Sequence, residues 1–127
     1  MRVKITSVMV EDQQKALQFY TGILGFVKKT EIPMGEHKWL TVVSSEEPDG
    51  VEIVLEPMGF APAKVFQKQL KDAGIPWTAF YVDDIQKEYT RLVKLEVKFS
   101  MSPTAMGPVT IAVFDDTCGN NIQLVQV

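Results

Sequence analysis

Val10-Glu11-Asp12-Gln13-Gln14-Lys15 and Val82-Asp83-Asp84-Ile85-Gln86-Lys87 are two versions of one short segment, and this repetition decides the fold. The two copies lie 72 positions apart (82 − 10 = 72). Each copy follows a β-rich run and precedes a run with helical periodicity, and Asp12 is a plausible helix N-cap. A duplicated unit that cannot bury its own apolar face must pack on its twin. The repeat therefore predicts two like halves, with the groove between them as the natural place for a ligand.

The residues around each copy predict the same order of elements. In the first half, periodicity and turn residues predict a strand at 3–10, a helix at 12–24 ended by Gly25, and strands at 26–33, 38–43 and 51–56. In the second half they predict a strand at 77–82, a helix at 85–95, and strands at 97–101, 109–114 and 121–127, with a loop at 103–108. An amphipathic helix at 63–73, stopped by Gly74, connects the halves.

This order, βαβββ followed by a helical connector and a second βαβββ, predicts an α+β fold. Two four-stranded sheets with helices on their outer faces would form a single domain over 1–127, built from modules 1–57 and 76–127 with the connector at 58–75. The main competitor is a ferredoxin-like βαββαβ fold. It has too few strands to absorb the third and fourth strand runs of each half.

Composition narrows the class of protein and of partner. With 127 residues, 46% hydrophobic and 23% charged, the chain has the composition of an ordinary globular domain. The net charge of −3 and the scattered lysines argue against a nucleic-acid partner. No apolar run approaches ~18 residues, so no membrane span is expected. The N-terminus lacks the shape of a signal peptide, and the single cysteine, Cys118, cannot form an internal disulfide; a cytoplasmic location is the simplest interpretation.

Three stretches resemble one known superfamily. They are Ile5-Thr6-Ser7-Val8-Met9-Val10-Glu11-Asp12, Ala79-Phe80-Tyr81-Val82-Asp83-Asp84, and Phe114-Asp115-Asp116-Thr117-Cys118-Gly119-Asn120-Asn121-Ile122-Gln123-Leu124. In this order and spacing they resemble the vicinal oxygen chelate superfamily, which includes glyoxalase I, bleomycin-resistance proteins, fosfomycin-resistance enzymes and extradiol dioxygenases. The resemblance implies two βαβββ modules that form a cupped, eight-stranded pair of sheets with outer helices.

The same resemblance implies four metal-ligand positions, which here are Ile5, Glu52, Trp77 and Gln123. The first and third lie seven residues before Asp12 and Asp84 respectively. Isoleucine has no lone pair to donate, and the indole nitrogen is only a hydrogen-bond donor. Because a firm catalytic site needs at least three protein ligands, we expect no metal cofactor. A divalent ion would require Glu52, Gln123 and residues from elsewhere, such as a partner subunit.

Without a metal, the concave surface is expected to be a mostly apolar, aromatic small-molecule pocket with a few polar groups. Its predicted ligand-binding residues are Ile5, Ser7, Glu52, Glu56, Trp77, Tyr81 and Gln123, and further candidates for the concave face are Trp39, Thr41, Thr110 and Phe114. Glu52 is the best candidate for a chemical role, because a buried carboxylate either pairs with a cation or has a raised pKa. A simpler interpretation is that Trp77 fills the space of a missing metal while Glu52 bonds Gln123.

The sequence context of the other reactive side chains indicates structural or solvated roles rather than chemical ones. The one histidine, His37, is expected at a pocket edge or in solvent. The acidic pairs Glu46-Glu47 and Asp115-Asp116 fall in turns, where carboxylates are mostly solvated or capping groups. Cys118 has no basic neighbour that would lower its pKa.

Three functions are compatible with these observations. The leading hypothesis is a metal-independent binding protein of the bleomycin-resistance kind, a homodimer that holds an apolar or aromatic small molecule, with a cationic group as one option. Trp77 would supply a stacking face and Glu52 the charge. The second is a metal-dependent enzyme, a glyoxalase-like lyase or isomerase or a dioxygenase. The third is a partner-binding module, which would show a large exposed apolar patch.

Overall fold

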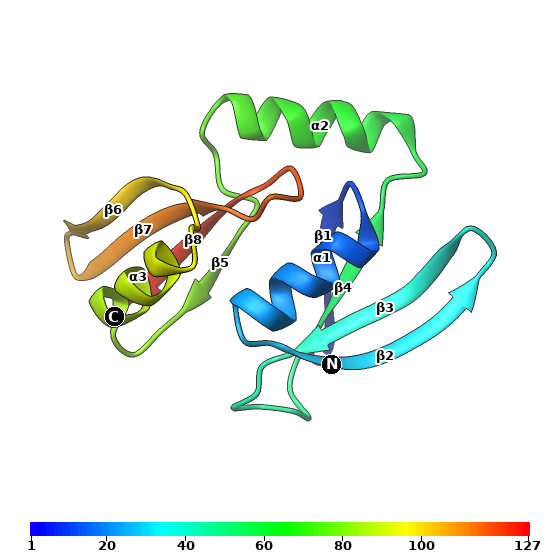
Figure 1. Cartoon of the computed structure of the whole chain (residues 1–127), viewed down its shortest axis with the longest axis horizontal. Coiled ribbons are helices and arrows are strands. Elements are labelled where there is room, and N and C mark those ends of the chain that lie inside the picture. The colour runs from blue at the N-terminus through cyan, green and yellow to red at the C-terminus, as the bar shows by residue number, and fades with distance from the viewer. The chain divides into compact units, whose positions relative to one another are not determined.

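The computed structural model describes all residues, Met1–Val127, as two compact units, 1–64 and 65–127 (Figure 1). Unit 1 contains β1 (Ile5–Val10), α1 (Gln13–Gln18), η1 (Phe19–Ile23), β2 (Val27–Met34), β3 (His37–Val43) and β4 (Glu52–Pro57). Helix α2 (Ala61–Asp72) starts in unit 1 and continues into unit 2, which contains β5 (Thr78–Tyr81), α3 (Ile85–Lys94), β6 (Phe99–Met106), β7 (Val109–Asp115) and β8 (Asn121–Gln126). The predicted α+β order of elements is confirmed.

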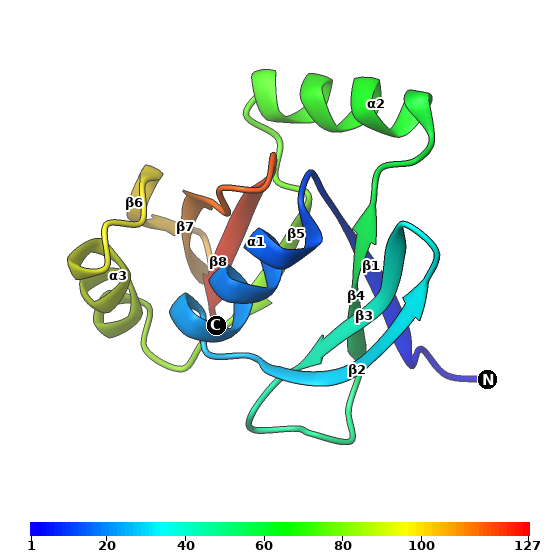
Figure 2. The ribbon, with the colours of Figure 1, turned by 45° about the vertical axis from the view of Figure 1, so that its right-hand side comes forward.

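Each unit holds one four-stranded sheet, and the two sheets have the same topology. The strand order is β1-β4-β3-β2 in unit 1 and β5-β8-β7-β6 in unit 2. The first strand of each unit pairs in parallel with the last, and the remaining pairs are antiparallel. Figure 2 shows the β2–β3 hairpin of unit 1 as a long, curved ribbon. The duplicated sequence thus produces a duplicated sheet.

The repeated segment ends a strand and starts a helix in both units. Asp12 and Asp84 have extended backbone conformations with φ values of −142° and −137°. The Asp12 carboxylate accepts a hydrogen bond from the Lys15 N–H at 3.0 Å, and the Asp84 carboxylate accepts one from the Lys87 N–H at 3.0 Å. Each side chain satisfies a main-chain donor that the first helical turn would leave free.

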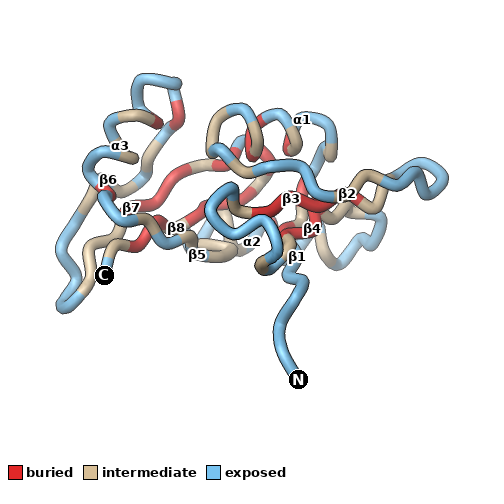
Figure 3. The backbone as a smooth tube through the Cα atoms, turned by 90° about the horizontal axis from the view of Figure 1, so that it is seen from below, coloured by how far each residue is buried: buried red, intermediate tan, exposed pale blue.

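The core of each unit lies between its sheet and one helix. In unit 1, Val8, Val10 and Leu55 face α1 and η1, where Ala16 and Tyr20 are fully buried. In unit 2, the buried side chains of α3 are Ile85 and Leu92, and the strands opposite them carry Phe114, Ile122 and Leu124. Figure 3 shows that burial concentrates on the central strands β3, β4, β7 and β8. One face of each sheet is therefore closed by a helix.

The first helix widens before it ends. It was predicted to run regularly to Leu24, but η1 is a π-helical turn in which the Leu24 N–H donates to the Phe19 carbonyl at 3.0 Å. The wider turn brings successive side chains closer in direction, and the adjacent Phe19 and Tyr20 are both buried. Gly25 then ends the helix as predicted, with a φ of +91° that favours glycine.

The predicted loop at 103–108 is wrong in its first part, because β6 continues to Met106 and only then turns. Pro103 lies inside this strand. Strand β6 is at the edge of its sheet, and its register with β7 shifts between Met101 and Thr104. Proline lacks an N–H but is tolerated in an edge strand at such an irregularity, where no ladder hydrogen bond is required.

No helix of the chain has both the length and the hydropathy that a membrane span requires.

The side-chain amide of Gln13 joins two strands of unit 1 to α1. Its Nε2 donates to the main-chain carbonyls of Lys38 and Leu55, at 2.8 and 2.9 Å, and its Oε1 accepts from the Lys38 N–H at 3.0 Å. Residues 38 and 55 lie on β3 and β4, beyond the directly paired Thr41–Val54 and Val42–Ile53 positions. One side chain thus replaces main-chain bonds that the two strands do not make with each other.

Replacing Gln13 by alanine should lower the free energy of unfolding by about 1–3 kcal/mol, because part-buried main-chain groups would lose their partners. Urea unfolding followed by circular dichroism measures this change. The control is Gln14→Ala, an exposed neighbour on the same helix, which should change stability by less than about 0.5 kcal/mol. Similar stabilities of the two variants would contradict the bridging role of Gln13.

Candidate functional site

The sheet of unit 1 has a second face, opposite α1, that we call the open face of unit 1. It carries Ile5, Ser7 and Met9 of β1, Glu52, Val54 and Glu56 of β4, and Trp39 and Thr41 of β3. The register aligns Ile5 with Glu52 and Met9 with Glu56. Four of the predicted ligand-binding residues, and both further candidates from β3, therefore share one face.

Glu52 is half-buried on this face and has one hydrogen-bond partner, which the sequence did not suggest. Its Oε1 accepts from the hydroxyl of Thr41 at 2.7 Å. Thr41 is fully buried, so the carboxylate is held in place by a rigid neighbour. Ile5, directly opposite on β1, is 47% exposed and leaves the Glu52 side of the face accessible.

Two basic residues of the sheet point the other way. Lys28 and Lys38 both form ion pairs with Glu31, at 2.6 and 2.8 Å. In the strand register these three residues share the face of Leu40 and Val42, which is the helix side. The hydrogen bonds from Lys28 and then Lys38 lower the pKa of Glu31 to about 2. No ion pair involves Glu52 or Glu56, so the open face of unit 1 has two carboxylates without a basic partner.

The sheet of unit 2 also has a face opposite its helix α3, which we call the open face of unit 2. The register places on it Trp77, Ala79 and Tyr81 along β5, Asn121, Gln123 and Val125 of β8, and Ile111 and Val113 of β7. Tyr81 is 69% exposed, whereas Trp77 and Gln123 are half-buried. The remaining three predicted ligand-binding residues thus share this face.

Two further candidates for the concave face, Thr110 and Phe114, were assigned to the wrong face. Phe114 pairs with Ile122, and Thr110 pairs with Gln126. Both pairs alternate with the Val113–Gln123 and Ile111–Val125 pairs, so their side chains point to the α3 side, and Phe114 is completely buried. Side chains alternate along a strand, and an error of one residue therefore reverses the face.

Trp77 contacts an aromatic ring from α2 that the sequence did not single out. Its main-chain N–H donates to the Asn121 carbonyl at 2.8 Å, which extends the β5–β8 pairing by one residue. Its indole ring packs edge to face with Phe66, with ring centroids 5.7 Å apart and planes at 68°. The available signal was the apolar pair Val65-Phe66 in a helix interpreted only as a connector.

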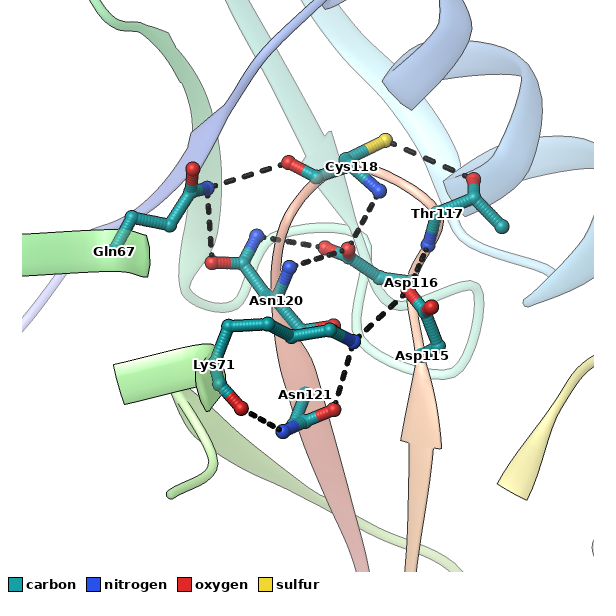
Figure 4. A network of polar contacts seen from close by, with 8 residues as sticks. All are labelled: Gln67, Lys71, Asp115, Asp116, Thr117, Cys118, Asn120 and Asn121. Atoms are coloured by element: carbon teal, nitrogen blue, oxygen red, sulfur yellow. Dashed lines mark hydrogen bonds and ion pairs between the residues drawn. The ribbon is translucent and has the colours of Figure 1, made fainter. Parts of the chain in front are cut away.

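The turn at 115–121, between β7 and β8, is ordered around a buried carboxylate (Figure 4). Asp116 is completely buried, and its Oδ1 accepts from the N–H groups of Cys118 and Asn120, at 2.8 and 3.0 Å. Its Oδ2 accepts from the Asn120 side-chain amide at 2.8 Å. Asp116 is therefore a capping group inside the protein rather than a solvated turn residue.

Helix α2 is attached to the 115–121 turn by two side chains one helical turn apart. Gln67, which is 4% exposed, donates to the Cys118 carbonyl and to the Asn120 side chain, at 3.3 and 3.2 Å. Lys71 donates to the Asn121 side chain at 2.8 Å and forms an ion pair with Asp115 at 3.2 Å. These contacts fix the part of α2 that carries Phe66 (Figure 4).

The other reactive side chains lie as follows. His37 is exposed at the start of β3, and Glu46 and Glu47 are exposed in the β3–β4 connection. The thiol of Cys118 is 1% exposed. These environments are those of structural or solvated groups.

The residues at the four expected metal-ligand positions do not form a suitable donor set. Ile5 and Trp77 cannot donate a lone pair to a metal, which leaves one carboxylate and one neutral amide. No group of three or more His, Cys, Asp or Glu side chains in the chain is placed to hold a metal ion. The residues present therefore do not fit the metal that the resemblance implies.

This topology, with the same strand order and a capped helix in each unit, defines a known class. The chain belongs to the Glyoxalase/Bleomycin resistance protein/Dioxygenase superfamily, whose family model matches residues 2–124. The resemblance seen in the sequence is thereby confirmed.

Its relatives include one close homologue and two solved structures of the same fold. The chain is 54% identical over 126 residues to the uncharacterized protein YurT of Bacillus subtilis (strain 168), and the match covers 99% of each chain. The structure of UcmS2 is 31% identical with a TM-score of 0.87, covering 100% of this chain and 98% of that one. TnmS3, an antibiotic binding protein from Streptomyces sp. CB03234, is 26% identical with a TM-score of 0.77, covering 99% and 95%.

Replacing Gly119 by alanine should disrupt the 115–121 turn. A Cβ atom there would lie 2.6 Å from Oε1 of Gln67, and the φ of +101° disfavours any side chain. We expect a loss of about 1–3 kcal/mol in the free energy of unfolding, measured by urea denaturation. Gly59→Ala is the matched control, since its Cβ would meet nothing within 4 Å. Equal stability of both variants would contradict the tight contact between the turn and Gln67.

Proposed function

We propose that this protein binds an apolar or aromatic small molecule without a metal. The observation that carries the proposal is the half-buried Trp77, with the ring of Phe66 packed against it, on the sheet face opposite α3. The proposed contact residues are Ile5, Ser7, Glu52, Glu56, Trp77, Tyr81 and Gln123. The description of TnmS3 as an antibiotic binding protein supports a small-molecule ligand.

The side chains of the open faces suit such a ligand. Ile5, Met9 and Trp39 in unit 1, and Trp77 and Tyr81 in unit 2, offer apolar and aromatic surface with partial exposure. Aromatic rings contribute large contact areas at low conformational cost, and methionine adapts to irregular shapes. Glu52, Glu56 and Gln123 add the few polar groups that orient a ligand in sites of this kind.

The charge of unit 1 favours a ligand that carries a cationic group. Glu52 and Glu56 lie on one face, and neither takes part in an ion pair. The Thr41 hydroxyl engages one oxygen of Glu52 and holds the side chain in a fixed position. An ammonium group placed there would gain a partner without displacing a lysine or arginine.

We also propose that the protein acts as a homodimer, as the resemblance to bleomycin-resistance proteins suggests. Several apolar residues of β2, an edge strand, are more than 40% exposed: Val27, Ile32 and Met34. Light scattering at micromolar concentration gives the mass directly, and a monomer would contradict this part of the proposal.

Replacing Trp77 by alanine should weaken ligand binding about tenfold, because an aromatic stacking surface of about 1.4 kcal/mol is lost. Isothermal titration calorimetry with a panel of planar aromatic antibiotics, including daunorubicin, measures the affinity with and without EDTA. Val93→Ala, which truncates an exposed apolar side chain of α3, is the control and should bind like the parent protein. Absence of binding across the panel at 1 mM (about 4 kcal/mol of affinity) would contradict the proposal, and loss of binding in EDTA would contradict its metal independence.

The contribution of the Glu52 charge to affinity can be measured with two ligands that differ in charge. Glu52→Gln keeps the shape of the side chain and removes the charge, so the affinity for daunorubicin, a cation at neutral pH, should fall about three- to tenfold. The affinity for neutral N-acetyl daunorubicin should change by less than about twofold. Raising the salt concentration should reduce the difference between the two ligands in the parent protein. An equal loss for both ligands would show that Glu52 acts through shape or hydrogen bonding instead.

A further inference from the structure

Phe66 has an unusual position for a large aromatic side chain. It lies on α2 within unit 2, is 55% exposed, and still makes a defined edge-to-face contact with the half-buried Trp77. Such a contact is favourable by itself, but it covers less than half of the Phe66 side chain. Two aromatic rings at 68° to each other, one 55% exposed and one half-buried, thus lie together at the Trp77 end of the open face of unit 2.

Hydrogen bonds near the two rings fix the positions of the helix and the strand that carry them. Gln67, the residue after Phe66, is buried and bonded to Cys118 and Asn120 of the 115–121 turn. The same turn leads into Asn121, whose carbonyl accepts the main-chain N–H of Trp77 at 2.8 Å. One turn therefore anchors the helix that carries Phe66 and the strand that carries Trp77.

The anchoring turn is itself well ordered. Three N–H groups converge on the buried carboxylate of Asp116, and Lys71 ties the next turn of α2 to Asp115 and Asn121. Gly119 allows the close approach of Gln67 that any larger residue would prevent. This arrangement uses several buried polar groups to fix the part of α2 that carries Phe66.

We propose that Phe66 is a further ligand-contacting residue, that it forms with Trp77 a two-ring surface for a planar aromatic ligand, and that Gln67 is the positioning residue for this pair. The proposal rests on the proposed function and extends it to α2. Rings held in place before binding lose little conformational freedom when the ligand arrives, so their contacts contribute more to affinity. A ligand that stacks parallel to one ring is steeply inclined to the other and makes an edge-to-face contact with it. Both geometries are ones that aromatic pairs prefer.

The test uses the full-length protein and daunorubicin as the probe, with affinity measured by calorimetry. Phe66→Ala should weaken binding about fivefold or more, whereas Val65→Ala, an equally exposed neighbour on α2, should change it less than about twofold. Phe66→Tyr should retain the affinity and Phe66→Leu should not, because the contact is with an aromatic face rather than with apolar volume alone.

The outcomes separate this proposal from the proposed function. If Trp77→Ala weakens binding while Phe66→Ala does not, the role of Phe66 is refuted and the proposed function stands. If neither change weakens binding, the role of Phe66 and the contact proposed for Trp77 are both refuted, whereas absence of binding across the whole antibiotic panel refutes the proposed function as well. Equal effects of Val65→Ala and Phe66→Ala would also refute a specific role for the ring.

The positioning role of Gln67 has its own test. Gln67→Leu keeps the volume of the side chain but removes its hydrogen bonds to the turn, and should weaken binding by a factor similar to that of Phe66→Ala. In the double variant the two effects should not multiply, because Gln67 acts through Phe66. Multiplying effects would refute the positioning role. Should Gln67→Leu fail to fold, as judged by circular dichroism, Phe66→Ala and Phe66→Leu, which alter only an exposed side chain, still decide the proposal.

Discussion

The parallel pairing of the first strand with the last strand in each unit is the constraint on which the rest of the structure depends. It aligns Ile5 with Glu52 in unit 1 and Ala79 with Gln123 in unit 2. Because side chains alternate along a strand, this register decides at once which residues enter the helix-covered core and which remain on the open face. A shift of β4 by one residue would place Glu52 beneath α1, and a shift of β1 by one residue would expose Val8. The capping carboxylates of Asp12 and Asp84 then end the first strand where the helix must turn back across the sheet.

The two units have the same topology but use different side-chain hydrogen bonds to stabilise it. In unit 1 the amide of Gln13 bridges β3 and β4, whereas the matching position of the repeat in unit 2 is Ile85, a buried apolar residue. There the Ile85 N–H is satisfied by the side chain of Gln126 at 2.8 Å. In unit 2 the buried polar side chains gather in the turn around Asp116. No buried side-chain nitrogen or oxygen in the chain lacks a hydrogen-bond partner. The two units therefore share the order of their elements but differ in the side-chain hydrogen bonds that join these elements.

The open faces of the two units carry different side chains. The face of unit 1 combines two carboxylates with Ile5, Met9 and Trp39, and the face of unit 2 is dominated by Trp77, Tyr81 and small apolar residues. Ile5 and Trp77 stand where the superfamily resemblance implies metal ligands, and their side chains cannot serve as such. The two open faces therefore differ in chemistry: the one in unit 1 is acidic, and the one in unit 2 is mainly aromatic and apolar.

The sequence by itself determined the duplicated α+β order and the N-cap at Asp12, because periodicity, capping and turn preferences depend on residues a few positions apart. The superfamily followed from the resemblance of three stretches to a known family. The sequence also placed Ile5, Glu52, Trp77 and Gln123 on their strand faces. Only the tertiary structure decided the faces of Thr110 and Phe114, since strand boundaries read from sequence are not accurate to one residue. The structure alone also revealed three further features: Pro103 within β6, the burial of Asp116 and the contact between Phe66 and Trp77. The bond from Gln67 to Asn120 joins residues 53 positions apart, and no local pattern carries information about which distant groups a folded chain brings together.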